Sequence, residues 1–136
     1  MFLYRGAKAE EKQQLFEEIY QRRGEFTGLV VSSDYFAIEL IDALKHKGMC
    51  IPQDLSVVGF DDIDMAKLVS PRLTTIHQGV ARKGQLAVVQ LLKQLSGERL
   101  PERNIRLAVQ LVERESVCCL SKKMSENQKK AGFQIT

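Results

Sequence analysis

The sequence predicts an α/β fold with a parallel sheet flanked by helices. Apolar residues follow a helical spacing in residues 9–23 and 34–48, and they form short continuous runs in residues 26–31 and 55–60. Short connections join these segments, and helices that alternate with strands in this way build a parallel sheet. At 136 residues, 44% of them hydrophobic, the chain is long enough for one domain with a core.

The first helix and the first strand come from two different apolar patterns. An apolar stripe with the spacing of one helix face predicts a helix over residues 9–23, formed by Leu15, Phe16, Ile19 and Tyr20. Residues 26–31 (FTGLVV) form a short run rich in β-branched residues, which is typical of a strand covered on both faces. This strand leads into Ser32, Ser33 and Asp34.

A second helix is expected over residues 34–48, where apolar residues again recur at helical spacing. Asp34 is suited to cap its N-terminus, and Gly48 is suited to end it. Pro52 and Asp54 then mark a turn into a second buried strand over residues 55–60.

The rest of the chain adds weaker elements. Residues 65–69 predict a short helix or a loop, and residues 73–76 (LTTI) predict a third strand. Residues 80–95 are strongly helical, with apolar residues on more than one stripe, so this helix needs neighbours over a wide arc. Residues 105–116 alternate apolar and polar side chains as a half-buried strand does. Residues 121–136 are polar, and we expect a disordered tail.

Charge and composition argue against several classes of protein. The formal charge of +3 comes from 20 scattered basic and 17 acidic residues, without the basic cluster that phosphate contacts require. Cys50, Cys118 and Cys119 form neither a CxxC pair nor an even count, which favours a reducing compartment. The N-terminal residues are too polar for a signal peptide or a membrane span, so we expect a cytoplasmic protein.

Two acids, Asp61 and Asp62, directly follow the second predicted strand and are the main candidate site. In open α/β sheets ligands bind beyond the carboxyl ends of the strands, and Ser32, Ser33 and Asp34 end the first strand at the same edge. If the two strands are parallel neighbours, both groups of side chains face one crevice.

Enzymatic and metal-binding alternatives stay open for these acids. A ribose-phosphate site of the phosphoribosyltransferase type needs a glycine and a hydroxyl after the acids to bind the phosphate, and residues 63–66 (IDMA) supply neither. A magnesium site could use Asp61, Asp62 and Asp64, because hard cations prefer carboxylate oxygens. His46 lies at a helix end, where a solvated histidine complements the helix dipole, and His77 has no serine or cysteine placed near it by the sequence. We therefore expect no catalytic residue, metal or cofactor.

Several motifs occur in a characteristic order between Phe26 and Ser116. A strand ends in Ser33 and Asp34 before a helix, and GMCIPQDLSVVGFDD, SPRLTTIHQ, a helix containing Gly84 and Ala87, and LVERES follow. In this order and spacing the chain resembles the LacI/GalR transcriptional regulators, specifically the latter half of their effector-binding domain.

The resemblance implies a partial periplasmic-binding-protein-like fold, mostly its C-terminal lobe. Residues 1–120 would form part of the effector-binding domain, and residues of about 79–104 would cross to the first lobe. The crossover helix of the isolated chain would then expose apolar surface around Leu86, Val89 and Leu92, or bury it in a non-native contact or dimer. In this family two lobes close on a small molecule, commonly a sugar or a nucleobase, and change DNA binding by a helix-turn-helix. That helix-turn-helix is absent from this chain, which therefore resembles a truncated or excised fragment.

The resemblance also assigns residues. Asp61 would accept hydrogen bonds from the effector, and Gln78 would face the cleft. Ser33 stands where sugar-binding members usually have asparagine, while Asp62 would cap the following turn.

A homodimer is also implied, with an interface that includes Ile38, Asp42, Leu68 and Val69. The main expectation is thus a regulator, not an enzyme, whose small-molecule effector is a carbohydrate. Two alternatives remain, a solute-binding protein of the same fold and a phosphoribosyl-type enzyme.

Overall fold

The computed structural model describes residues 9–98 and 104–119. The elements follow in the order α1 (Ala9–Gln21), β1 (Gly28–Val30), α2 (Asp34–His46), β2 (Ser56–Phe60), a short helical turn η1 (Asp64–Lys67), β3 (Thr74–Gln78), α3 (Val80–Leu95) and β4 (Val109–Val112). The predicted order of helices and strands is confirmed, although the first and last strands are shorter than expected. The predicted tail over residues 121–136 lies outside the described residues.

The strands form one sheet in the order β1-β2-β3-β4. β1 pairs with β2 and β2 pairs with β3, both in parallel, so the carboxyl ends of these three strands meet at one edge of the sheet. β4 runs antiparallel to β3. The predicted α/β fold with a parallel sheet and flanking helices is therefore confirmed, with one antiparallel strand added at its border.

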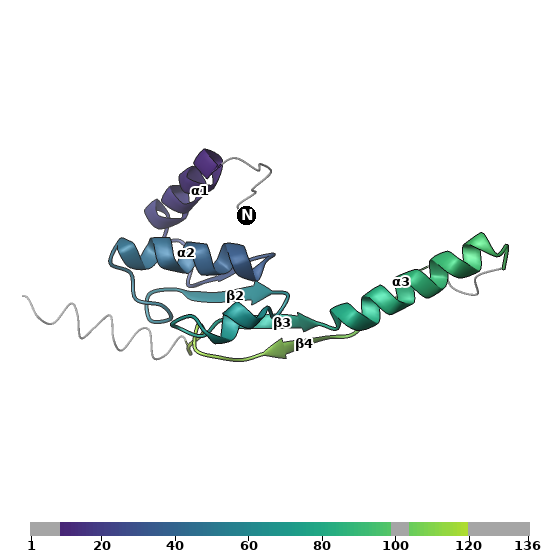
Figure 1. Ribbon diagram of the computed structural model, residues 1–136. Helices are drawn as coiled ribbons and strands as arrows, with labels where there is room; N and C mark the ends of the chain where they lie inside the picture. The colour runs from purple at the N-terminus through teal and green to yellow at the C-terminus, as the bar shows by residue number, and fades with distance from the viewer. Residues whose placement is uncertain (1–8, 99–103, 120–136) are drawn as a thin grey trace, which may run out of the picture.

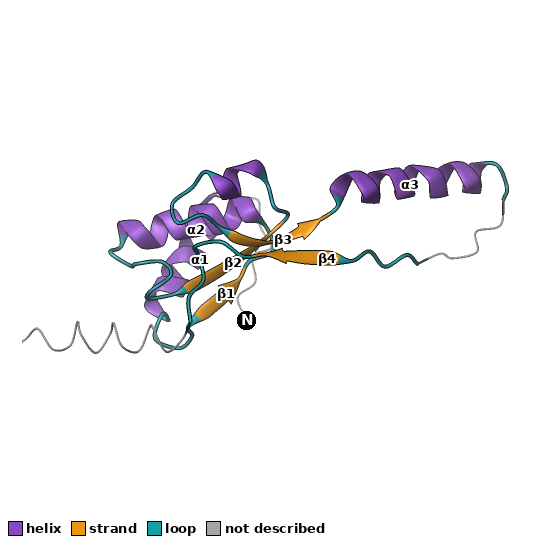
Figure 2. Cartoon of the chain, turned by 90° about the horizontal axis from the view of Figure 1, so that it is seen from below, coloured by secondary structure: helices purple, strands orange, loops and turns teal. Residues whose placement is uncertain are grey.

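The core lies between the sheet and the two helices α1 and α2. Figures 1 and 2 show both helices on the same side of the sheet. α2 buries the stripe that its helical spacing predicts, and the sheet and α1 complete the core, whose apolar members include Phe16, Ile19, Ala37, Leu40, Ile41, Leu44, Leu55, Val57 and Leu73.

Among the described residues, no helix covers the opposite face of the sheet. Val30 on β1 keeps 81% of its surface exposed, and Leu111 on β4 is also exposed. The prediction of a first strand covered on both faces is therefore wrong for this part of the chain, because α1 and α2 pack on the same side.

α3 projects away from the sheet, as Figures 1 and 2 show, and none of its residues is buried. It carries an exposed apolar stripe at helical spacing, composed of Val88, Leu91, Leu92 and Leu95. Val89 is exposed as well, whereas Leu86 is half-buried. Among the described helices, none combines the length and the apolar character needed to span a bilayer.

The carboxylate of Asp34 is fully buried and connects three elements. It accepts hydrogen bonds from Thr75 Oγ1 at 2.5 Å and from the backbone N–H of Ile63 at 3.0 Å. The prediction that Asp34 caps α2 is wrong, since Ser33 occupies the N-cap position, without a side-chain cap hydrogen bond, and Asp34 turns inward. Two donors in the core take the place of the helix N–H groups.

Gly59 on β2 provides the space for this carboxylate. A Cβ atom at this position would lie 2.1 Å from Asp34 Oδ1 and 2.8 Å from Leu73 Cδ2, both closer than van der Waals contact allows. A side chain at position 59 would therefore displace the carboxylate from its donors.

We predict that Gly59→Ala lowers the free energy of unfolding by about 1–3 kcal/mol, the usual cost of overpacking a core. Gly84→Ala is the matched control, because a Cβ there meets no atom within 4 Å and alanine favours a helix over glycine by about 1 kcal/mol. Urea unfolding followed by circular dichroism measures both variants. Equal midpoints for the two would contradict this assignment.

Candidate functional site

Asp61 and Gln78 meet at the carboxyl edge of the sheet. Gln78 ends β3, and its Nε2 donates a hydrogen bond to Asp61 Oδ1 at 2.5 Å. The backbone N–H of Asp61 donates to the carbonyl of Ile76 at 3.0 Å, which extends the pairing of β2 with β3 by one residue. Lys83 on α3 donates to Gln78 Oε1 at 3.2 Å. The structure therefore brings two of the three predicted effector residues into contact.

The backbone of the two acids is unusual. Asp61 has φ 119° and Asp62 has φ 55°, in the left-handed region that favours glycine. Such a conformation in two successive non-glycine residues costs free energy and persists only where surrounding contacts hold it. Because of this turn, the two carboxylates have separate partners.

Asp62 does not cap the following turn, contrary to the prediction. Its Oδ1 accepts a hydrogen bond from Arg114 Nη2 at 2.5 Å, and its Oδ2 lies 3.0 Å from His77 Nδ1. Burial raises the pKa of the Asp62 carboxyl, but the hydrogen bonds from Arg114 and His77 outweigh burial and leave the pKa below its ordinary value. Asp62 therefore has a structural role at neutral pH, as the anion of a shielded ion pair.

Arg114 belongs to this candidate site, and the sequence did not single it out. It follows β4 in the motif LVERES, on a segment that alternates apolar and polar residues. The one available signal was an arginine on a half-buried strand, since a charged group in such a position needs a partner. The sequence did not show which acid that partner would be.

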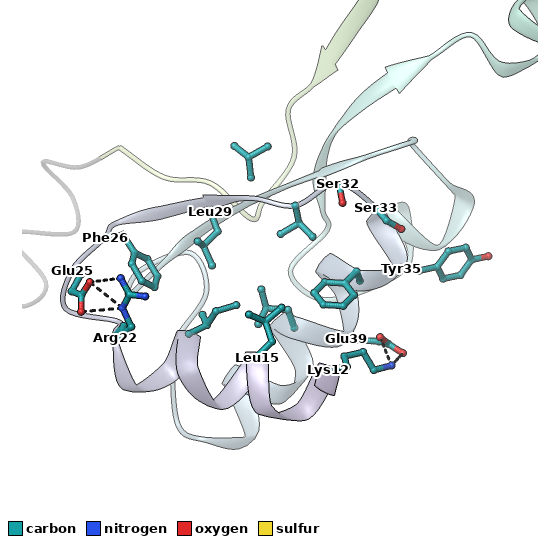
Figure 3. Close-up of a pocket in the computed structure, with 15 residues that line it drawn as sticks. Lys12, Leu15, Arg22, Glu25, Phe26, Leu29, Ser32, Ser33, Tyr35 and Glu39 are labelled. Atoms are coloured by element: carbon teal, nitrogen blue, oxygen red, sulfur yellow. Dashed lines mark hydrogen bonds and ion pairs between the residues drawn. The ribbon is translucent and has the colours of Figure 1, made fainter. Parts of the chain in front are cut away.

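Ser33, the third predicted effector residue, is not joined to Asp61 and Gln78. Figure 3 shows Ser32 and Ser33 at the mouth of a groove between α1, β1 and α2, with a volume of about 970 Å³. The groove is largely apolar, and neither Asp61 nor Gln78 lines it. Two ion pairs flank it, Lys12 with Glu39 and Arg22 with Glu25.

The geometry gives no support to the magnesium alternative. Asp61 binds Gln78 and Asp62 binds Arg114, while Asp64 is exposed and pairs with Lys67 at 3.2 Å. Within residues 9–98 and 104–119, no three His, Cys, Asp or Glu side chains gather as a metal ion would require. What this arrangement can do is accept hydrogen bonds at an oriented carboxylate.

The four predicted interface residues lie on two adjoining segments. Asp42 on α2 is exposed, as is Leu68 after η1, with 78% of its surface accessible. Ile38 and Val69 are half-buried against the core. Lys45 Nζ donates to the carbonyl of Ser70 at 2.8 Å and joins the two segments.

The sequence is similar to bacterial transcriptional regulators. Residues 3–117 match the model of the periplasmic binding protein-like domain. The HTH-type transcriptional regulator RegA of Clostridium saccharobutylicum is 41% identical over 91 residues, which are 67% of this chain and 27% of that protein. The HTH-type transcriptional repressor PurR of Vibrio cholerae is 36% identical over 96 residues, 71% and 29% of the two chains. The ribose operon repressor of Haemophilus influenzae is 39% identical over 94 residues, which are 69% of this chain and 28% of that protein.

Solved structures of regulators share the fold. Transcription regulator CcpA of Lactococcus lactis matches with a TM-score of 0.73 and 25% identity, over 83% of this chain and 41% of that one. A LacI family transcriptional regulator from Arthrobacter in complex with lactose matches with a TM-score of 0.66 and 30% identity, over 82% and 43%. The Lac repressor dimer bound to operator and anti-inducer matches with a TM-score of 0.68 and 30% identity, over 82% of this chain and 39% of that one.

The chain spans less than a third of the length of these curated relatives. The family model nevertheless covers most of the chain, and the sheet with its flanking helices has the fold of these regulators. The chain therefore belongs to the periplasmic binding protein-like domain family and corresponds to part of the effector-binding domain of LacI/GalR-type transcriptional regulators.

Proposed function

We propose that this chain supplies one wall of an effector site, and that a small molecule bound there controls DNA binding by a helix-turn-helix of the whole protein. The observation that carries the proposal is the Asp61 carboxylate, held by Gln78 at the carboxyl edge of a parallel sheet. This edge is where open α/β sheets bind ligands.

The chemistry of Asp61 favours a ligand with hydroxyl groups. Gln78 orients the carboxylate through Oδ1, and no hydrogen bond from the described residues occupies Oδ2. A carboxylate accepts hydrogen bonds from two hydroxyls at once, and hydrogen bonds to a charged oxygen are stronger than neutral ones. A vicinal diol fits these requirements, which makes a carbohydrate our proposed effector.

The names of similar proteins support the same ligand class. The Arthrobacter regulator was solved in complex with lactose, and the Haemophilus influenzae relative is named for a ribose operon. These relatives are transcriptional regulators, which favours a regulator over a solute-binding protein and over a phosphoribosyl-type enzyme. We accordingly assign no catalytic role and place the protein in the cytoplasm, with its DNA.

We propose that residues 79–104 cross to a first lobe and that this lobe covers the apolar stripe of α3. None of the described residues buries this stripe, and a helix with apolar side chains at this spacing normally packs on a partner surface.

We propose that the chain dimerises through the surface around Leu68 and Asp42. The exposed Leu68 side chain and the hydrogen bond from Lys45 to Ser70 make α2 and the segment after η1 one continuous surface. Apolar side chains that protrude from such a surface are frequent anchors of an interface.

Asp61→Ala in the complete protein is expected to weaken effector binding by about 10- to 150-fold, the equivalent of about 1.5–3 kcal/mol for hydrogen bonds to a charged group. Calorimetry against ribose, lactose and cellobiose, with nucleobases as the competing class, measures the loss. DNA binding without effector should persist. Asp64→Ala is the control, since that carboxylate is exposed and pairs only with Lys67 among the described residues. Unchanged effector response in Asp61→Ala would exclude the assignment.

For α3 we predict that the isolated chain binds an apolar-surface dye and that Leu92→Lys with Leu95→Lys removes most of the signal. Gln94→Lys adds one positive charge beside the stripe without removing an apolar side chain, and it should leave the fluorescence unchanged. A chain that binds no dye, or a double variant that binds as much as the parent, would disprove an uncovered stripe.

For the interface we predict that Leu68→Glu weakens dimerisation about tenfold or more, because an anchor residue is replaced by a charge that must be desolvated. Sedimentation equilibrium of the complete protein provides the measurement. Gln13→Glu on the exposed side of α1 is the control. Identical dimer dissociation constants would mean that the surface lies elsewhere.

A further inference from the structure

Arg114 connects the segment after β4 to two other parts of the fold. Its backbone N–H donates to Thr74 Oγ1 at 2.9 Å, and its Nη1 donates to the carbonyl of Leu73 at 2.8 Å. Its Nη2 donates to Asp62 Oδ1. Arg114 is thus anchored at the start of β3 while its guanidinium reaches the acid turn that follows β2.

The ion pair of Arg114 with Asp62 is the most shielded of those found in the described ranges. Both side chains are only 12% exposed, whereas every other pair includes a side chain that is exposed by more than a third. A charge pair away from water interacts more strongly than a pair on the surface, and removing one partner leaves a buried charge.

The acid turn depends on contacts of this kind. Asp61 and Asp62 both have positive φ angles, which non-glycine residues adopt only under constraint. Both carboxylate oxygens of Asp62 have a partner, Arg114 at Oδ1 and His77 at Oδ2. The Asp61 carboxylate accepts a hydrogen bond from Gln78. Gln78, which binds Asp61, precedes α3 in the chain. Arg114, which binds Asp62, follows β4.

We propose that Arg114 is a positioning residue of the effector site: through Asp62 it fixes the left-handed turn that directs the Asp61 carboxylate toward Gln78 at the carboxyl edge of the sheet. Arg114 makes no contact with the effector. The proposal rests on the proposed function in that Asp61 is the group that binds the effector.

The charges around Asp62 agree with this role. Burial raises the pKa of its carboxyl, and the hydrogen bonds from Arg114 and His77, with the charges of Arg114 and Lys67, lower it by more. A carboxyl with a folded-state pKa below its unfolded value contributes stability above the unfolded pKa, and this stability is lost as the pH falls through the folded-state pKa. At neutral pH the ion pair is therefore intact.

The test needs no effector in its first part. NMR of the labelled full chain follows the Asp62 carboxyl titration, the Gln78 side-chain amide and the exchange of the Asp61 N–H, which is bonded to Ile76. Arg114→Met is expected to raise the pKa of Asp62, to shift the Gln78 amide and to speed exchange of the Asp61 N–H about tenfold, while the amides of α2 keep their protection.

Two further variants guard against a general loss of stability. Arg114→Lys keeps the positive charge, so its three signals should lie between those of the parent and those of Arg114→Met. If Arg114→Met does not fold, the comparison of Arg114→Lys with the parent provides the test. Arg72→Met is the matched control, because Arg72 pairs with the neighbouring Glu115 on the exposed surface, and it should change none of the three signals. Unchanged signals in a folded Arg114→Met, or equal acceleration of exchange throughout the chain, would overturn the proposal.

The second part measures binding of ribose and lactose to the complete protein. Arg114→Met is expected to weaken binding of the sugar that binds the parent by about tenfold, less than Asp61→Ala does. If the parent binds neither sugar, the carbohydrate assignment fails while the NMR result still decides the positioning role. If the parent binds and Arg114→Met binds equally well, the positioning role fails and the proposed function stands.

Discussion

The buried carboxylate of Asp34 is the constraint on which the rest of the structure depends. It is fully buried, and its two donors come from β3 and from the turn after β2. A buried polar group that lacks hydrogen-bond partners costs free energy, so these donors and the space at Gly59 are required together. The position of α2, the register of the parallel strands and the path of the chain beyond β2 are consequently coupled through one side chain.

The acid turn shows how this constraint positions the candidate site. Asp34 binds the N–H of Ile63, directly after the two acids, and the pairing of β2 with β3 continues to the N–H of Asp61. Between these two fixed points the backbone of Asp61 and Asp62 adopts positive φ angles. The adjacent carboxylates then have different functions: Asp61 is oriented at the edge of the sheet, and Asp62 is engaged by Arg114 and His77.

Sequence patterns predicted the elements well and the polar partners poorly, for a physical reason. Apolar spacing is local, so residues 80–95 matched the observed bounds of α3. The partner of a polar side chain is set by the fold: Thr75 lies 41 residues from Asp34, and Arg114 lies 52 residues from Asp62. The capping prediction put Asp34 at the correct end of the helix but gave its carboxylate the wrong hydrogen-bond partners. Capping rules consider only the helix N–H groups and do not include donors from the core. The resemblance to a family supplied Asp61 and Gln78, which local patterns would not have paired.

Hydrogen exchange at the N–H of Ile63 tests the central role of Asp34 most directly. Thr75→Val removes the hydroxyl donor while preserving the shape of the side chain, and Thr75→Ser retains the donor. We expect the N–H groups of Ile63 and Asp61 to exchange more than about tenfold faster in Thr75→Val, because a buried carboxylate that loses a donor is costly, and to stay protected in Thr75→Ser. Wild-type protection of Ile63 in a folded Thr75→Val would contradict the account.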